Sequence, residues 1–157
     1  MMTVGIRIAE TADWPVLASL HNVCFSEQWT PFGLGQLLAG EGTYALLADD
    51  EDGVRGFILV RVVADEAEIL TFAVHPLWRR QGLGRDLLYA AARLATLQGG
   101  RTLILEVAVA NFAARQLYGR FGFQQAGLRR AYYEPGQKGD AFILKRPLPL
   151  APIGETG

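Results

Sequence analysis

The 157-residue chain has one cysteine and two histidines, and none of its apolar runs reaches the roughly 18 residues that a membrane-spanning helix needs. A single cysteine, Cys24, excludes an internal disulfide, and no group of Cys and His has the spacing of metal ligands. The first residues, MMTVGIR, lack the apolar segment of a secretory signal. We therefore expect a soluble cytoplasmic protein without a metal or a membrane contact, with Cys24 as a small buried thiol on a helix.

An excess of positive charge is also absent. Lys and Arg total 15 against 16 Asp and Glu, so the formal net charge is -1. Proteins that bind nucleic acid through its phosphates carry a basic surface, so direct binding of nucleic acid is not expected. Hydrophobic residues make up 50% of the chain, which is enough at this length for one domain with a real core.

The spacing of apolar residues predicts an α/β (α+β) domain, with a mixed sheet covered by helices. The predicted order is one strand, two helices, three strands, a helix, a strand, a helix and two strands. The strands are expected at 4–8, 43–48, 55–64, 67–74, 102–108, 126–130 and 141–145, and the helices at 14–20, 30–40, 86–98 and 111–120. Residues 1–146 form the predicted domain, and residues 147–157 form a flexible tail.

The segment RRQGLGR, residues 79–85, leads from a predicted strand into a predicted helix. The first turn of a helix leaves about four N–H groups without partners and carries partial positive charge, so its natural ligand is an anion. Gly82 and Gly84 let the backbone approach phosphate oxygens, and nearby side chains add charge. The segment therefore predicts a pyrophosphate site, with contributions from Arg79, Arg80 and Arg85.

Other phosphate loops fit this segment less well. No G-K-S or G-K-T follows it, and Leu87 stands where the dinucleotide motif G-x-G-x-x-G needs its third glycine. What remains is R-x-x-G-x-G between a strand and a helix. From the residues alone, a merely flexible start of a helix stays open as an alternative.

Several segments resemble a known family. AVHPLWRRQGLGRDLL, residues 73–88, resembles the acetyl-CoA-binding segment of the GNAT superfamily of N-acetyltransferases, and the predicted order of elements agrees with that fold. Within it, the chain is most similar to the bacterial ribosomal-protein-alanine N-acetyltransferases of the RimI type. The similar pieces are CFSEQWTPF at 24–32, RRQGLGR at 79–85, LEV at 105–107 with Asn111, LYGRFGF at 117–123, and RRAYY at 129–133 with Asp140 and Ala141.

The resemblance implies a GNAT fold in one domain, with a mixed, mostly antiparallel central sheet flanked by helices, and acetyl-CoA as cosubstrate. It also implies that the backbone before the loop pairs with the pantetheine arm, with the N–H of Val74 as the favoured donor to the oxyanion. Asn111 is a predicted helix cap, and the resemblance adds a contact to CoA. The residues expected to bind acetyl-CoA are Phe72, Ala73, Val74, Arg80, Gln81, Gly82, Leu83, Gly84, Arg85 and Asn111.

Glu106 interrupts the otherwise apolar strand LILEVAV, and alternation places it on the same face as Ile104 and Ala108. Partial burial would raise its pKa toward the range of a general base that acts directly or through a water. The alternative is a glutamate at the rim paired with one of the arginines. In the RimI-like family the matching residue is the proposed proton acceptor.

Tyr118 lies on the predicted helix that follows Asn111, and helical spacing alone favours a core aromatic. A phenol with a pKa near 10 can nevertheless protonate a leaving thiolate, whose conjugate acid has a pKa near about 8.5. The resemblance assigns this proton donor to Tyr118. Trp29, Tyr132 and Tyr133 either line the entry of a peptide N-terminus or pack as ordinary aromatics, and His21 and His75 are expected to be structural.

The predicted reaction is transfer of an acetyl group from acetyl-CoA to the α-amine of a protein, by direct attack in a ternary complex. An α-amine with a pKa near 8 loses its proton more readily than a lysine near about 10.4. By resemblance, the substrate is the N-terminal alanine of a small-subunit ribosomal protein. Acetylation of a small amine or of another protein, and a non-catalytic acyl-CoA-binding module, remain alternatives.

Overall fold

The computed structural model describes residues 4–25, 28–130 and 139–150. The predicted order of helices and strands is confirmed, and two short 3-10 helices, η1 and η2, were not predicted. The elements are β1 (Gly5–Ile8), η1 (Thr11–Asp13), α1 (Trp14–Cys24), α2 (Pro31–Leu38), β2 (Thr43–Asp50), β3 (Gly53–Val63), β4 (Glu66–Val74), η2 (Pro76–Trp78), α3 (Leu83–Leu97), β5 (Thr102–Ala108), α4 (Phe112–Arg120), β6 (Gln124–Arg129) and β7 (Ala141–Pro147).

Local signals set most of the helix ends. Thr30 caps α2 by accepting a hydrogen bond from the Gly33 N–H at 3.0 Å, and Pro31 is its first residue. Helix α2 ends at Leu38 rather than near residue 40. Helix α3 ends at Leu97 beside Gly99, whose φ of 94° is left-handed, as expected of the glycine that closes a helix.

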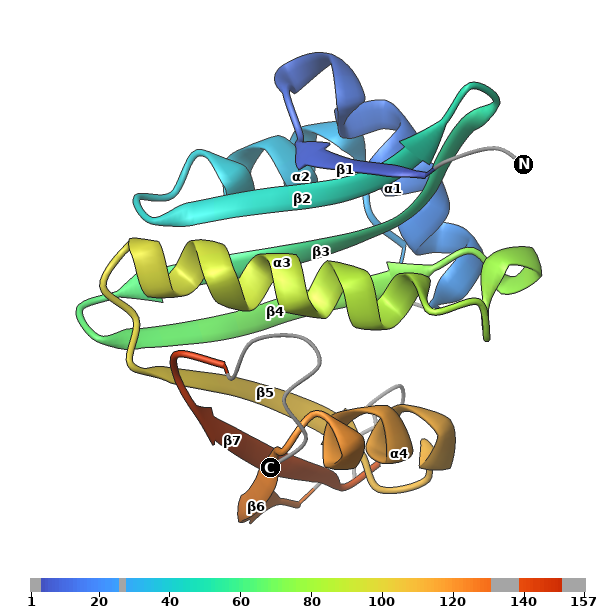
Figure 1. The fold of residues 1–157 in the computed structure, drawn as a ribbon. Helices are drawn as coiled ribbons and strands as arrows, with labels where there is room; N and C mark the ends of the chain where they lie inside the picture. The colour runs from blue at the N-terminus through green and yellow to red at the C-terminus, as the bar shows by residue number, and fades with distance from the viewer. Residues whose placement is uncertain (1–3, 26–27, 131–138, 151–157) are drawn as a thin grey trace.

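The strands of the described residues form one sheet in the order β1-β2-β3-β4-β5-β7-β6. All neighbours are antiparallel except β4 and β5, which run parallel, so the predicted mixed, mostly antiparallel sheet is confirmed. Helices α1 and α2 cover one face of β2–β4, and α3 and α4 lie on the opposite face (Figure 1). None of the described helices has the length and apolar character to cross a membrane.

The parallel junction between β4 and β5 is short. Only three pairs join the strands, Glu66 with Thr102, Ala67 with Leu103 and Glu68 with Ile104. A bulge against β3 follows, because Ile69 pairs with Val60 and Thr71 with Leu59, which leaves Leu70 without a partner. Beyond it the strands part toward the start of α3 (Figure 1). We call this unpaired part, between residues 69–74 of β4 and 105–108 of β5, the β4–β5 split.

The folded part of the chain extends past the predicted domain end at residue 146. Pro147 is the last residue of β7, and the Leu148 N–H donates to the Arg101 carbonyl at 2.9 Å. Leu148 and Leu150 pack against the core on the α3 side. Of the segment predicted to be a tail, residues 151–157 lie outside the described residues.

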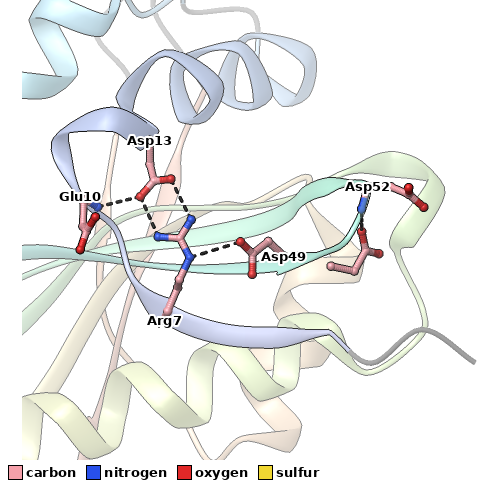
Figure 2. Close-up of polar contacts among 6 residues, drawn as sticks. Arg7, Glu10, Asp13, Asp49 and Asp52 are labelled. Atoms are coloured by element: carbon pink, nitrogen blue, oxygen red, sulfur yellow. Dashed lines mark hydrogen bonds and ion pairs between the residues drawn. The ribbon is translucent and has the colours of Figure 1, made fainter.

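Strand β1, at the edge of the sheet, is attached to η1 and β2 through Arg7. Its guanidinium donates two hydrogen bonds to the Asp13 carboxylate, both at 2.8 Å, and a third to Asp49 at 3.2 Å. Asp13 also accepts from the Glu10 N–H at 2.8 Å, so one carboxylate ties the helical turn to the strand (Figure 2). The hydrogen bonds from Arg7 lower the pKa of Asp13 to about 2.

Replacing Asp13 with asparagine is expected to lower the free energy of unfolding by about 1 kcal/mol at pH 7, a modest value because Arg7 is half exposed. A carboxyl whose pKa is depressed on folding stabilises the protein above its unfolded pKa, near 3.8, and this contribution is lost as the pH falls toward about 2. Urea unfolding at pH 7 and pH 3 should show the difference shrinking at the lower pH. Glu51→Gln, in an exposed turn, is the control, and an equal loss there would contradict the assignment.

Candidate active site

The backbone of β4 faces the split at alternate residues. The His75 N–H donates to the Arg55 carbonyl at 2.8 Å, which fixes the phase of hydrogen bonding between β3 and β4. Because antiparallel pairs alternate, Ala73 exchanges its hydrogen bonds with β3, whereas Phe72 and Val74 direct their N–H and C=O groups away from β3, toward the split. We expected Ala73 to pair with pantetheine as well. Its backbone N–H and C=O groups point to β3 instead of the split.

The Val74 carbonyl is held by two side chains. Arg79 donates to it through Nε at 3.0 Å, and Cys24 approaches it with Sγ at 3.6 Å. Cys24 is the last residue of α1 and is half-buried, so the prediction of a thiol on a helix is confirmed, although it is less buried than expected. These contacts fix the end of β4 directly before the glycine segment.

Helix α3 begins at the mouth of the split. Gly82 is its N-cap with a left-handed φ of 83°, and within the described chain no side chain caps this first turn. A Cβ added to Gly84 would lie 3.3 Å from a ring carbon of Phe72 and 3.8 Å from Val74 Cγ2. Gly82 is therefore required by its conformation, and Gly84 lets the helix start close against β4. The uncapped amides and the positive end of the helix dipole favour an anion.

The other residues of the glycine segment are arranged around this first turn. The side chains of Arg80, Gln81 and Arg85 are exposed, whereas Leu83 is buried in the core, so Leu83 can offer only its backbone to a ligand. Arg80 has a φ of 63°, unusual for a residue with a side chain. The exposed arginines place positive charge beside the uncapped turn, which favours an anion there.

Glu106 lies on β5 two residues beyond the last pair with β4. Its side chain is 47% exposed, so Glu106 is less buried than expected. The physical reason is that α1 and α2 cover β2–β4 and leave this face of β5 without a helix among the described residues. Arg129 of β6 donates through Nε to Glu106 Oε2 at 3.0 Å, which matches the alternative of a rim glutamate paired with an arginine.

Tyr118 lies on the other face of the split. It is buried in the core on the α3 side, with its ring 6.4 Å from that of Phe72 and 5.6 Å from that of Phe123. Burial raises the pKa of its hydroxyl above the ordinary value near 10, so the phenol stays protonated across the physiological range. The position agrees both with a core aromatic and with a proton donor beside β4.

Asn111 caps α4, as predicted, by accepting a hydrogen bond from the Ala114 N–H at 3.2 Å. The cap uses only the side-chain oxygen, so the amide NH₂ keeps its two donors for a ligand. Helix α4 carries Tyr118, and the cap therefore sets where the phenol-bearing helix begins.

The segment around Trp29 packs beneath α1. The Trp29 ring stacks on His21 with centroids 3.8 Å apart, and Asn22 bonds both backbone groups of Trp29, at 2.7 and 2.8 Å. His21 is buried and His75 accepts from the Leu77 N–H, so both histidines have structural contacts, as expected. Tyr132 and Tyr133 lie outside the described residues.

The split thus joins two groups of residues that lie on opposite faces of the sheet. Leu105 and Val107 of β5 point into the core beneath α3, and the alternation of β5 sends Glu106 to the opposite face. The start of α3 and Tyr118 therefore lie on one face, and the carboxylate lies on the other. Among the described residues, no group of His, Cys, Asp and Glu could hold a metal ion.

The pairing of Arg129 with Glu106 was not predicted from the sequence. The two residues are 23 positions apart, on strands that are not neighbours in the sheet, because β7 lies between β5 and β6. The motif RRAYY pointed to this region, but no signal in the sequence distinguishes Arg129 from Arg130.

The chain has clear relatives. The family model described as the Acetyltransferase (GNAT) family matches residues 14–123. Ribosomal protein bS18-alanine N-acetyltransferase of Salmonella typhimurium is 36% identical over 150 residues, which are 92% of this chain and 98% of the relative. The crystal structure of the ribosomal-protein-S18-alanine N-acetyltransferase from Escherichia coli has a TM-score of 0.84 at 31% identity, covering 99% of this chain and 100% of that one. Arabidopsis thaliana NAA60 in complex with acetyl-CoA shares the fold, with a TM-score of 0.82 at 18% identity, over 93% and 99% of the chains.

Proposed function

The chain belongs to the acetyltransferase (GNAT) family, and we propose that it acetylates the N-terminal alanine of ribosomal protein bS18. It is an acetyl-CoA-dependent N-acetyltransferase, with acetyl-CoA as cosubstrate. The acceptor is inferred from the names of relatives that align along nearly their whole length. The reaction takes place in the cytoplasm, on a protein N-terminus and without direct binding of nucleic acid or membrane.

The observation that supports this function most strongly is the β4–β5 split, with backbone groups facing it from one strand and a carboxylate on the other. The N–H and C=O groups of Phe72 and the N–H of Val74 offer a pantetheine arm the hydrogen bonds of an added strand, whereas the Val74 C=O already accepts from Arg79. The uncapped start of α3 holds the pyrophosphate, with Arg80 and Arg85 beside it. The NH₂ of Asn111 is the further contact to CoA.

The acceptor amine reaches the thioester from the opposite face, where Glu106 accepts its proton. As the amine nitrogen bonds to the thioester carbonyl carbon, negative charge develops on the carbonyl oxygen. The N–H of Val74 faces the split and donates a hydrogen bond to that oxygen. Because Glu106 is half exposed, a water can relay the proton to it.

Collapse of the intermediate breaks the C–S bond, and the thiolate of CoA takes a proton from Tyr118. Burial holds this hydroxyl in its neutral form, ready to donate. The phenolate that remains is costly in its apolar surroundings and must be reprotonated before the next turnover.

An assay with an alanine-starting peptide tests the proposal. The peptide should carry one internal lysine and be compared with the same peptide acetylated at its N-terminus, with CoA release followed by thiol detection and the modified atom located by mass spectrometry. We expect release of CoA and acetylation of the α-amine with the free peptide, and no reaction with the blocked one. Equal acetylation of the lysine in both peptides would contradict the choice of acceptor. CoA binding without release from any amine would favour a non-catalytic module.

Replacing Gly84 with valine is expected to weaken acetyl-CoA binding about tenfold. The added side chain meets Phe72 and Val74, so it displaces the first turn of α3 from β4 and misaligns the amides with the pyrophosphate. Calorimetric titration with CoA measures the change. Gly119→Ala is the matched control, because nothing lies within 4 Å of an added Cβ there, and it should bind CoA as the wild type does. Unchanged affinity in Gly84→Val would contradict the location of the site.

A further inference from the structure

The pair of Arg129 and Glu106 crosses a strand. Glu106 of β5 lies opposite Ile143 of β7, whereas Arg129 of β6 lies opposite Ala141. Neighbouring strands are about 4.8 Å apart, so the arginine side chain must span β7 diagonally to reach the carboxylate. The residue opposite Arg129 is the small Ala141, whose side chain lies on the same face. The ion pair therefore lies on the face of β5–β7 that none of the described helices covers.

The same carboxylate has no second protein partner in the described chain. Arg129 is its only hydrogen-bonding and ionic partner there, and it occupies Oε2 alone, at 3.0 Å. Both side chains are close to half exposed, at 43% for Arg129 and 47% for Glu106. An ion pair between exposed side chains is weak, so another cation can replace the guanidinium.

An acceptor α-amine arrives mostly as an ammonium ion, because its pKa lies near about 8. On the proposed mechanism it must come to Glu106, which accepts its proton. The guanidinium and the ammonium are both donors of hydrogen bonds with a single positive charge, and they need the same carboxylate. They therefore compete unless they bind different oxygens without interacting.

We propose that Arg129 is a displaceable counter-ion of Glu106, which holds the carboxylate in the free enzyme and gives it up to the ammonium group of the acceptor. This inference rests on the proposed function, and it makes Arg129 a positioning residue that sets the affinity for the acceptor. Exchanging one cation for another keeps a charged carboxylate paired throughout binding. The cost of the exchange is that the acceptor must break an existing pair, so its affinity is lower than an unoccupied carboxylate would give.

The test compares wild type with Arg129→Gln by calorimetric titration of an alanine-starting peptide into enzyme saturated with CoA, which binds the donor site but transfers nothing. We expect the variant to bind the peptide about two- to fivefold more tightly, which is the range expected for removal of one exposed ion pair. In steady-state assays the KM for the peptide should fall by a similar factor, with kcat changed less than KM. A residue that only supported the fold would lower kcat or stability without tightening the binding of the peptide.

Matched variants separate this role from other effects. Arg130→Gln removes the neighbouring exposed arginine and should leave the affinity unchanged, which excludes a general effect of charge. In a Glu106→Gln background, Arg129→Gln should no longer alter peptide affinity, because the carboxylate for which the cations compete is gone. Arg129→Lys, which keeps the charge, should bind the peptide as the wild type does.

Equal or weaker binding of the peptide by Arg129→Gln would overturn the inference, even if the wild type acetylates the peptide and the proposed function stands. Wild-type enzyme that acetylates no α-amine would contradict the proposed function itself, and the inference with it. Thermal unfolding of each variant shows that the compared proteins are folded.

Discussion

Glu106→Gln is expected to lower kcat by about 10²- to 10³-fold while leaving the affinity for CoA unchanged. Glutamine keeps the size of the side chain but cannot accept the proton of the amine, and a positioned general base typically contributes a factor of about 10²–10⁴. The carboxylate lies on the face of the sheet opposite the start of α3, so its loss should not disturb the donor site. The measurements are a steady-state assay with a peptide acceptor and a titration with CoA.

The pH dependence of Glu106→Gln distinguishes a base from an electrostatic anchor. If Glu106 removes the proton, the rate of the variant should recover in part as the pH rises toward and beyond about 8, where the α-amine loses its proton unaided. Glu68→Gln is the control, because Glu68 also forms an exposed ion pair, with Arg61, but it lies in the paired part of β4 and outside the split. A rate within twofold of wild type in Glu106→Gln would remove this residue from the mechanism.

Tyr118→Phe is expected to lower kcat about 10- to 100-fold with little change in the KM for the peptide. The substitution removes only the hydroxyl and keeps the ring between Phe72 and Phe123. The expected loss is smaller than for Glu106 because a thiolate, whose conjugate acid has a pKa near about 8.5, is a good leaving group even without a proton donor. Single-turnover measurements with the peptide would place the loss in the chemical step.

Two further measurements distinguish a proton donor from a core aromatic at Tyr118. The melting temperature of Tyr118→Phe should stay close to that of the wild type, since packing is preserved. The wild-type rate should not fall between pH 8 and pH 10 through this group, because burial raises the pKa of Tyr118 above 10 and the phenol remains protonated. An unchanged kcat in Tyr118→Phe would leave Tyr118 as a core aromatic and nothing more.

Local patterns in the sequence predicted much of the fold. Strand β5 has the bounds expected from its apolar run, and Thr30 and Asn111 cap helices as their residue types and positions indicated. Such features depend on hydrogen bonds between nearby residues and on the alternation of apolar and polar side chains, so a short segment of sequence is enough to predict them. The glycine segment was also correctly placed at the start of a helix, because Gly82 provides the left-handed N-cap.

Features that depend on pairing between distant segments were not predictable in this way. Alternation gave the face of Glu106 but not its exposure, which depends on α1 and α2 covering only part of the sheet. The partner of Glu106 depends on β7 lying between β5 and β6. The exclusion of Ala73 depends on the phase of hydrogen bonding with β3, which the sequence of β4 does not contain.

The short parallel junction between β4 and β5 has a kinetic consequence. With the start of α3 on one face of the sheet and Glu106 on the other, the proposed sites for the nucleotide-bearing donor and the polypeptide acceptor lie on opposite faces. On the proposed mechanism, and for the part of the chain that the structure describes, each reactant then has its own face of the sheet for entry and for departure of its product. The architecture therefore imposes no compulsory sequence of arrival or departure by steric obstruction, so any such sequence must come from changes in affinity.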